Sequence, residues 1–172
     1  MNARLVLALG LLVAMAAPAL SQDGADEAYL DDRSTPEAVV NSLYNAINRS
    51  EYLRAYSYYG ENSGVGGYEA FAKGYADTES VDILMGRSTS EGAAGSTYYS
   101  LPVAIDAVSR DGTHRQYAGC YTLRLANPQI QATPPFVPMH IEKGELKPAS
   151  GEFAGDPAIT VPMSDLTSPD LP

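Results

Sequence analysis

The stretch from Gly112 to Arg124, GTHRQYAGCYTLR, holds the only cysteine of the chain and one of its two histidines. A cysteine nucleophile and its histidine base must lie within about 3.2 Å of each other. His114 and Cys120 lie on one expected strand, and their spacing at about 3.3 Å per residue separates them by roughly 20 Å. They are therefore not partners. We expect Cys120 to be a small buried side chain and His114 to be exposed beside a turn.

Asp106 and His140 are the remaining candidates for acid-base chemistry. Asp106 lies within an apolar strand, and the expected hairpin register places it opposite Tyr117, so the two could act as a base and an orienting donor. The same register puts Asp106 on the less apolar face of the sheet, which favours an acid that faces solvent or a second copy of the chain. His140 alternates with apolar neighbours and lies either on the outer face or in the mouth of a cavity.

Signatures of cofactor and metal chemistry are absent from the sequence. The two histidines show neither HxH nor HExxH spacing, so we expect no metal site. There is no nucleophile elbow, phosphate-binding loop or dinucleotide fingerprint, and we expect no cofactor. The formal net charge of -10 argues against a nucleic acid partner, because nucleic acid binding draws its affinity from a cationic patch.

Tyrosine is prominent in the composition, with 12 tyrosines and no tryptophan. Several tyrosines fall on faces that we expect to point inward, where their hydroxyl groups need hydrogen-bond partners. Lining one cavity, they would suit a flat or amphipathic small ligand, whereas the alternative is ordinary core packing. The candidate ligand-binding residues are Tyr44, Tyr56, Tyr75 and Tyr99.

A second set of residues is expected on the outer face of the hairpin. Asp111 and Gly112 suit a two-residue turn, which would pair Ile105 with Ala118 and place Cys120 toward the helices. The outer row then consists of Tyr98, Tyr117, Tyr121 and Leu123. We interpret this outer row as a candidate interface, either in a homodimer or with an envelope protein.

Residues 1–21 are typical of a secretory signal peptide. Arg4 precedes an apolar run from Leu5 to Ala17, and small residues offer cleavage near residues 19–21. The run is shorter than the about 20 residues that a membrane-spanning helix needs, and we expect no membrane span in the mature chain. The sequence therefore predicts a secreted or periplasmic protein, with an acidic flexible leader over residues 22–34.

The periodicity predicts one α+β domain over residues 35–147. Thr35 and Pro36 are typical of a helix start, and an apolar stripe follows at helical spacing. Two shorter helices are expected over 51–59 and 67–77. Four segments with the alternation of strands come next, so the three N-terminal helices should pack on a four-stranded antiparallel sheet. Residues 148–172, rich in proline and acids, predict a disordered tail.

The phrase STPEAVVNSLYNAINRSEYLRAYSYYG, with a third helix and long strands after it, resembles the nuclear-transport-factor-two-like superfamily, also called the cystatin-like cone fold. The resemblance implies a sheet curled around the helices to enclose a conical cavity, often with dimerisation through the outer sheet face. Members of the superfamily include ketosteroid isomerase, scytalone dehydratase and many non-enzymatic exported domains. The fold alone therefore does not choose a function.

Three functions stay open on the sequence. The first is a secreted or periplasmic non-enzymatic domain that binds a small ligand or a protein. The second is an isomerase- or dehydratase-like enzyme with Asp106 or His140 as the base and Tyr117 as the donor. The third is an envelope accessory or structural module, which an exposed apolar patch at the outer row would favour.

Overall fold

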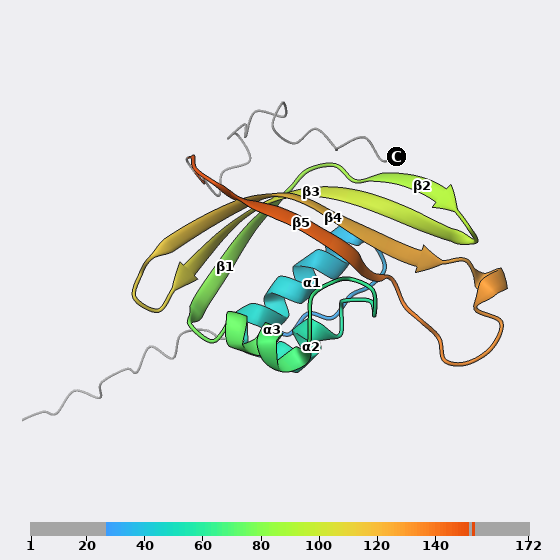
Figure 1. Ribbon diagram of the computed structural model, residues 1–172, viewed down its shortest axis with the longest axis horizontal. Coiled ribbons are helices and arrows are strands. Elements are labelled where there is room, and N and C mark those ends of the chain that lie inside the picture. The colour runs from blue at the N-terminus through green and yellow to red at the C-terminus, as the bar shows by residue number, and fades with distance from the viewer. Residues whose placement is uncertain (1–26, 152, 154–172) are drawn as a thin grey trace, which may run out of the picture.

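The structure, a computed structural model, describes residues 27–151 and 153. Its helices are α1 (Pro36–Asn48), α2 (Tyr52–Tyr56), α3 (Tyr68–Gly74) and a short 3-10 helix, η1 (Pro128–Ile130). Its strands are β1 (Thr78–Met85), β2 (Thr89–Ala93), β3 (Ser96–Ser109), β4 (His114–Ala126) and β5 (His140–Ala149). Figure 1 shows the sheet curling over α1, α2 and α3, which lie on its concave side. The predicted α+β class, with helices on one face of a curled antiparallel sheet, is confirmed.

The sheet has five strands instead of the four expected. The strand order is β1-β3-β4-β5, and β2 pairs with the first part of β3. The first of the four expected strands divides at Gly86 into β1 and β2, which pair with successive parts of the long strand β3. The Gly86 N–H donates to the carbonyl of Pro102 at 2.9 Å, and a side chain at Gly86 would crowd the Pro102 ring. This break lets the sheet bend around the helices.

The β3-β4 hairpin differs from the expected register by one residue. The Ser109 N–H donates to the Thr113 carbonyl at 2.9 Å, which leaves residues 110–112 in the loop. Gly112 has a φ of 80°, as expected for a type I turn closed by a left-handed glycine. The prediction of a two-residue turn is therefore wrong. A shift of one residue turns every side chain of a strand to the opposite face, so the faces predicted for β4 are also wrong.

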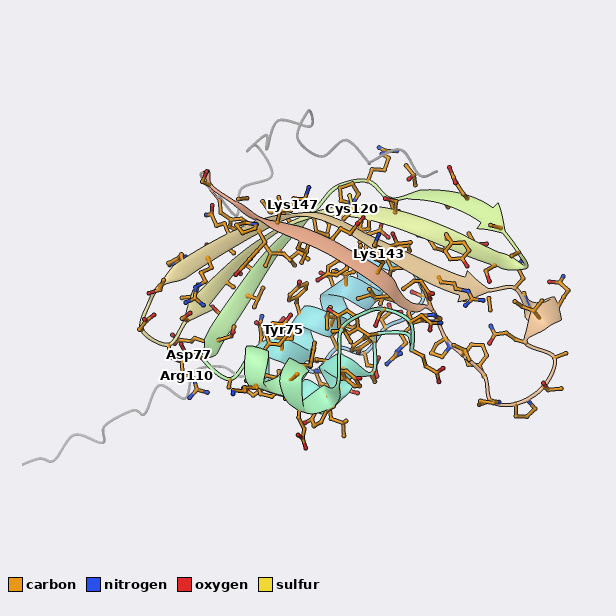
Figure 2. All side chains as sticks on the ribbon, in the orientation of Figure 1. Tyr75, Asp77, Arg110, Cys120, Lys143 and Lys147 are labelled. Atoms are coloured by element: carbon orange, nitrogen blue, oxygen red, sulfur yellow. The ribbon has the colours of Figure 1, made fainter. Side chains whose placement is uncertain are left out.

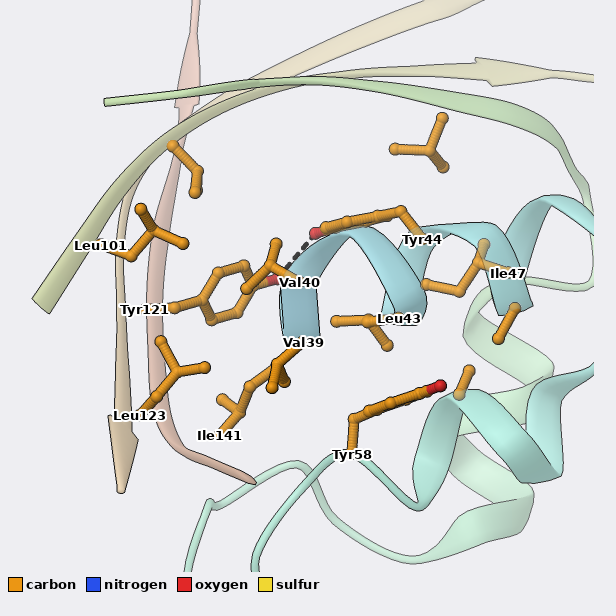
Figure 3. Packing of buried hydrophobic residues seen from close by; sticks show 14 of the residues in the cluster. Val39, Val40, Leu43, Tyr44, Ile47, Tyr58, Leu101, Tyr121, Leu123 and Ile141 are labelled. Atoms are coloured by element: carbon orange, nitrogen blue, oxygen red, sulfur yellow. Dashed lines mark hydrogen bonds between the residues drawn. The ribbon is translucent and has the colours of Figure 1, made fainter. Parts of the chain in front are cut away.

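The hydrophobic core lies between α1 and the concave face of the sheet, as Figure 3 shows. The inward side of β3 carries Leu101 and Val103, which are fully buried. On β4, however, Tyr121 and Leu123 are 2% and 0% exposed and belong to the core. Tyr117 also packs against this core. The outer face expected for these three residues is therefore wrong, and burial removes Tyr121 and Leu123 from any interface.

Two asparagines of α1 attach this helix to its neighbours. The Val81 N–H donates to Asn48 Oδ1 at 2.7 Å, and Asn48 Nδ2 donates to the Val81 carbonyl at 3.1 Å. Asn45 makes an equivalent pair of bonds with the preceding segment, accepting from the Leu30 N–H at 3.0 Å and donating to the Ala28 carbonyl at 2.8 Å. The phrase YNAINR therefore serves to anchor β1 and the N-terminal segment to α1.

Residues 27–34 pack against the helices, in contrast with the flexible leader expected there. The Asp32 N–H donates to Ser42 Oγ at 2.8 Å. Arg33 donates to the backbone carbonyl and to the hydroxyl of Ser57 at 3.0 and 2.8 Å. Side-chain hydrogen bonds thus fix this segment. Such bonds cannot be predicted from the periodicity of helices and strands.

Several expectations fall outside the described residues. The expected signal peptide over 1–21, its cleavage near 19–21, and most of the expected tail over 148–172 lie there. Pro148 and Ala149, which the tail was expected to include, instead end β5. Among residues 27–151 and 153, no helix has the length and apolar character needed to cross a membrane.

Candidate ligand-binding cavity

A cavity of about 300 Å³ lies between the helices and the inner face of the sheet. This volume is at the lower end of the range of about 300 to 1,000 Å³ typical of small-molecule sites. The apolar part of its wall comes from Val81, Ile105, Ala107 and Leu146. The polar side chains that line it are those of Tyr44, Tyr75, Thr78, Ser109, Arg115 and Tyr117. The sheet curl therefore encloses a space with an apolar body and several hydrogen-bonding groups.

The closed end of the cavity contains a pair of buried phenols. The hydroxyl oxygens of Tyr44 and Tyr121 lie 2.6 Å apart, as the dashed line in Figure 3 marks. Burial, with neighbouring tyrosines adding to it, raises the pKa of both phenols well above the ordinary value. The Tyr121 hydroxyl also bonds with the Tyr59 hydroxyl. Three O–H groups thus make two hydrogen bonds, and one O–H at an end of this row, on Tyr44 or Tyr59, is left to find another acceptor. Because Tyr44 lines the cavity, a ligand can supply that acceptor.

The open end of the cavity is marked by Arg115, which is exposed. Arg115 pairs with Ala107 in the β3-β4 ladder and lies on the same inner row of β4 as Tyr117 and Tyr121. It forms no ion pair within the described part of the chain. A guanidinium is protonated at any physiological pH, so the mouth of the cavity carries a fixed positive charge.

Tyr75 lies between these two ends, in the space between α3 and the sheet, as Figure 2 shows. Burial raises the pKa of its phenol to about 12, with a further contribution from Tyr117. The phenols of Tyr44 and Tyr75 therefore stay neutral near pH 7 and act as hydrogen-bond donors. Among the described residues, no carboxylate, imidazole or thiol lines the cavity. This set of groups can bind and orient a molecule but holds no ordinary general base.

The four candidate ligand-binding tyrosines separate into two pairs. Tyr44 and Tyr75 line the cavity, whereas Tyr56 and Tyr99 do not. The Tyr56 hydroxyl donates to the Gly66 carbonyl at 2.8 Å, so Tyr56 belongs to the helices and the loop that follows α2. Tyr99 is half-buried and packs against the core.

Asp106 lies outside the cavity, on the face of the sheet away from the helices. It pairs with Gln116 and not with Tyr117, so the predicted pair of a base and a phenol donor is wrong. Its Oδ2 lies 2.9 Å from Nδ1 of His114, and its Oδ1 is buried without a described partner. The side chain of His114 is 60% exposed, which confirms the exposure expected for it.

His140 also lies outside the cavity, at the start of β5. It is 9% exposed, and its Nδ1 donates to the Pro138 carbonyl at 3.0 Å, which assigns the proton to that nitrogen. Its Nε2 lies 3.2 Å from a carboxylate oxygen of Glu142. His140 lines a separate surface pocket together with Arg33 and Arg124. Neither proposed base therefore reaches the groups of the cavity.

Cys120 and Tyr98 lie on the convex face of the sheet. Cys120 is half-buried there, as Figure 2 shows, and not buried on the helix side as the register predicted. Burial raises the pKa of its thiol. Tyr98 is the only member of the outer row that stays on this face, where the guanidinium of Arg124 lies 5.9 Å from the centre of its ring. The other members lie on the inner face.

Arg115 and Tyr117 are the cavity residues that the sequence prediction missed. Arg115 was not a candidate, and Tyr117 was assigned to the wrong face. A signal was available within β4 itself, because its odd positions carry tyrosines and leucines, whereas its even positions carry Gln116, Thr122 and Arg124. That alternation alone indicates which side of the strand is buried.

Comparisons with known proteins give a limited result. No family model and no curated protein matches the chain. The chain is similar to the solved structure of Rv3472(D26N), a function unknown protein from Mycobacterium tuberculosis, with 14% identity, a TM-score of 0.45, and coverage of 75% of this chain and 77% of that chain. It is also similar to a hexachlorocyclohexane dehydrochlorinase (LinA) Type2, with 13% identity, a TM-score of 0.41, and coverage of 72% and 95%. Likenesses at this level carry no assignment of function.

The class of this protein follows from its own geometry. It is an α+β protein in which α1 to α3 pack against the concave face of a curled antiparallel sheet. Between the two layers lies a cavity lined by tyrosine hydroxyls and one arginine.

We expect the free energy of unfolding to decrease as the pH rises from about 10 toward 12. Tyrosines of an unfolded chain ionise near pH 10, whereas burial holds the pKa of Tyr75 at about 12. Above pH 10 the unfolded state therefore binds fewer protons than the folded state, and stability falls with pH. Below pH 10 the contribution is fully present. Urea unfolding followed by circular dichroism at several alkaline pH values measures this slope.

Tyr75→Phe provides the control for this prediction. The variant removes one of the titrating phenols and should make the alkaline decrease in stability less steep than in the unmodified protein. A slope that is identical with and without the Tyr75 hydroxyl would contradict the expected coupling between the burial of this phenol and folding.

Proposed function

We propose that this protein is a secreted or periplasmic cone-fold protein, not an enzyme, that binds a small amphipathic ligand in the cavity between its helices and its sheet. The observation that carries the proposal is the cavity of about 300 Å³ with apolar walls and several inward-facing donors. Pockets that bind small molecules combine apolar surface with placed polar groups, and this cavity has both.

The chemistry of the lining supports binding rather than catalysis. Proton transfer in an isomerase or dehydratase needs a base within reach of the substrate. The two candidate bases, Asp106 and His140, lie outside the cavity, and the described lining contributes phenols, hydroxyls and a guanidinium. The raised pKa of Tyr44 and the pKa of about 12 of Tyr75 make these phenols donors rather than bases near pH 7.

Export is supported by the sequence of the first residues. Arg4, the apolar run that follows it and the small residues near 19–21 have the pattern of a secretory signal. An exported binding protein would meet its ligand outside the cytoplasm. Fractionation of cells that produce the full chain, with N-terminal sequencing of the mature protein, tests this part of the proposal.

The binding proposal is tested by a variant that fills the cavity. Ala107 lines the cavity on β3, so Ala107→Leu should occupy part of its volume and weaken binding of a small-molecule hit by about tenfold or more. A fragment screen by protein-observed NMR supplies the hits, and titration calorimetry measures the affinity. The screen should give saturable binding with shifts at Tyr75 and Leu146.

The matched control is Ala118→Leu, which adds the same side chain to the opposite face of the sheet. This variant should bind the same hits with unchanged affinity. Circular dichroism confirms that both variants are folded. The proposal fails if the folded protein shows no saturable binding, or if Ala107→Leu and Ala118→Leu bind equally well.

A further inference from the structure

The inner row of β4 contains one charged residue where the pattern calls for an apolar one. Tyr117, Tyr121 and Leu123 continue this row into the core, and Arg115 begins it at the mouth of the cavity. Arg115 is exposed, so water can solvate it, but its positive charge at the mouth of a cavity attracts an anionic ligand. Within the described residues Arg115 has no ion pair, so its guanidinium is available to such a ligand.

The groups around Arg115 fix the charge of that ligand. Arg115 is the only ionised side chain among the described residues that line the cavity. One acid that responds to it is Asp111, whose pKa is lowered first by hydrogen bonds from Thr113 and to a smaller degree by Arg115. The Asp111 carboxylate accepts from the Thr113 N–H at 2.9 Å and is thus already held. One free guanidinium, with its planar fork of donors, matches one carboxylate.

At the closed end of the cavity the ligand needs a group other than a carboxylate. Tyr44 is 4% exposed, and its hydroxyl shares a single hydrogen bond with Tyr121 at 2.6 Å. Tyr121 bonds in turn with the Tyr59 hydroxyl. The three hydroxyls therefore make two hydrogen bonds with three O–H groups, and an acceptor beside Tyr44 would satisfy the remaining donor. A neutral acceptor such as a carbonyl or hydroxyl oxygen fits here, because a second charge would have to be buried without a cation. The walls between the two ends are apolar, from Val81, Ile105 and Leu146.

We infer that the ligand is a compact carboxylic acid whose carboxylate binds Arg115 at the mouth and whose far end presents a neutral oxygen to Tyr44. Its body is an apolar ring or short chain that fits a volume of about 300 Å³. The inference rests on the proposed function, since it specifies the ligand class of the same cavity.

Titration calorimetry with matched probes tests the carboxylate. The probes are 4-oxocyclohexanecarboxylate, 4-hydroxybenzoate and their primary amides, which have nearly the same shape without the charge. Near neutral pH each acid should bind the purified protein about tenfold more tightly than its amide. Arg115→Gln should abolish this difference by weakening the binding of the acids. Arg110→Gln, at an exposed arginine of the same hairpin outside the cavity, should preserve it.

A second pair of probes tests the neutral oxygen. Cyclohexanecarboxylate lacks the carbonyl of 4-oxocyclohexanecarboxylate and should bind more weakly to the unmodified protein. Tyr44→Phe should remove this preference while the preference for acids over amides persists. Circular dichroism establishes that Tyr44→Phe and Arg115→Gln retain the fold.

The outcomes separate the inference from the proposed function. If acids and amides bind with equal affinity, or if Arg115→Gln keeps the preference for acids, the carboxylate assignment is overturned and the binding function stands. If Tyr44→Phe leaves the preference for the carbonyl intact, the assignment of the far end is overturned. If neither acids nor amides bind the folded protein, the inference and the proposed function fall together.

Discussion

Gly119→Ala is expected to lower the free energy of unfolding by about 3 kcal/mol or more, an effect at the upper end for a single substitution. A Cβ at Gly119 would overlap the backbone oxygen of Glu145 in the neighbouring strand β5. Backbone oxygen cannot rotate away as the end of a side chain can, so β5 would have to move from β4. Urea unfolding followed by circular dichroism measures the loss.

Gly92→Ala is the matched control for this prediction. Gly92 also lies in a strand, β2, but apart from its two chain neighbours no heavy atom of the described residues lies within 4 Å of the position that its Cβ would take. The substitution should change the free energy of unfolding by no more than about 0.5 kcal/mol. Equal, small effects at both glycines would show that β5 does not approach β4 as closely as described.

Leu123→Ala is expected to lower the free energy of unfolding by about 2 to 5 kcal/mol, the range for a leucine removed from a core. Leu123 is 0% exposed and belongs to the cluster that packs between α1 and the sheet. The one-residue change of register brings it there. On the outer face, where the two-residue turn would place it, the same substitution would cost no more than about 0.5 kcal/mol.

Leu53→Ala supplies the comparison, because Leu53 lies in α2 and is 67% exposed. Truncation of this side chain should leave the urea midpoint almost unchanged. If Leu123→Ala has an equally small effect, then the inward face of β4 is assigned incorrectly. Tyr117 and Arg115 lie on the same face as Leu123, so they would not line the cavity either.

Local patterns predicted the elements well because the physics that forms them is local. The Thr35 hydroxyl accepts from the Ala38 N–H at 3.1 Å, and Pro36 begins α1, as the capping pattern indicated. The apolar stripe of α1 faces the core. The order of helices and strands, and hence the α+β class, follows from such signals.

The turn between β3 and β4 shows that local patterns do not determine the register of a hairpin. An aspartate followed by glycine is compatible with a two-residue turn and with a three-residue loop that ends in a left-handed glycine. The chain adopts the longer loop, with Gly112 at a φ of 80°. The two choices differ by one residue, which decides the face of Tyr117 and the partner of Asp106. The strand's own alternation would have resolved the choice.

The candidate cavity could be predicted only in part. Tyr44 follows from the helical spacing of α1, and Tyr75 from the helical spacing expected over residues 67–77, although α3 ends at Gly74. Arg115 acquires its role from the register of β4 and from the curl of the sheet, which brings α3, β1 and β5 around one space. Those relations depend on pairings between distant segments, and no short window of sequence contains them.

The asparagine that joins α1 to β1 also bears on how the protein behaves in a crowded solution. The exposed edge of a sheet is a template on which another chain can add a strand and begin an aggregate. At the β1 edge both backbone groups of Val81 are occupied by Asn48. At the β5 edge Ile141 is bonded to Tyr58 and Gly60, and exposed lysines follow at 143 and 147. Strand addition by another molecule is thus disfavoured at Val81 of β1 and along β5.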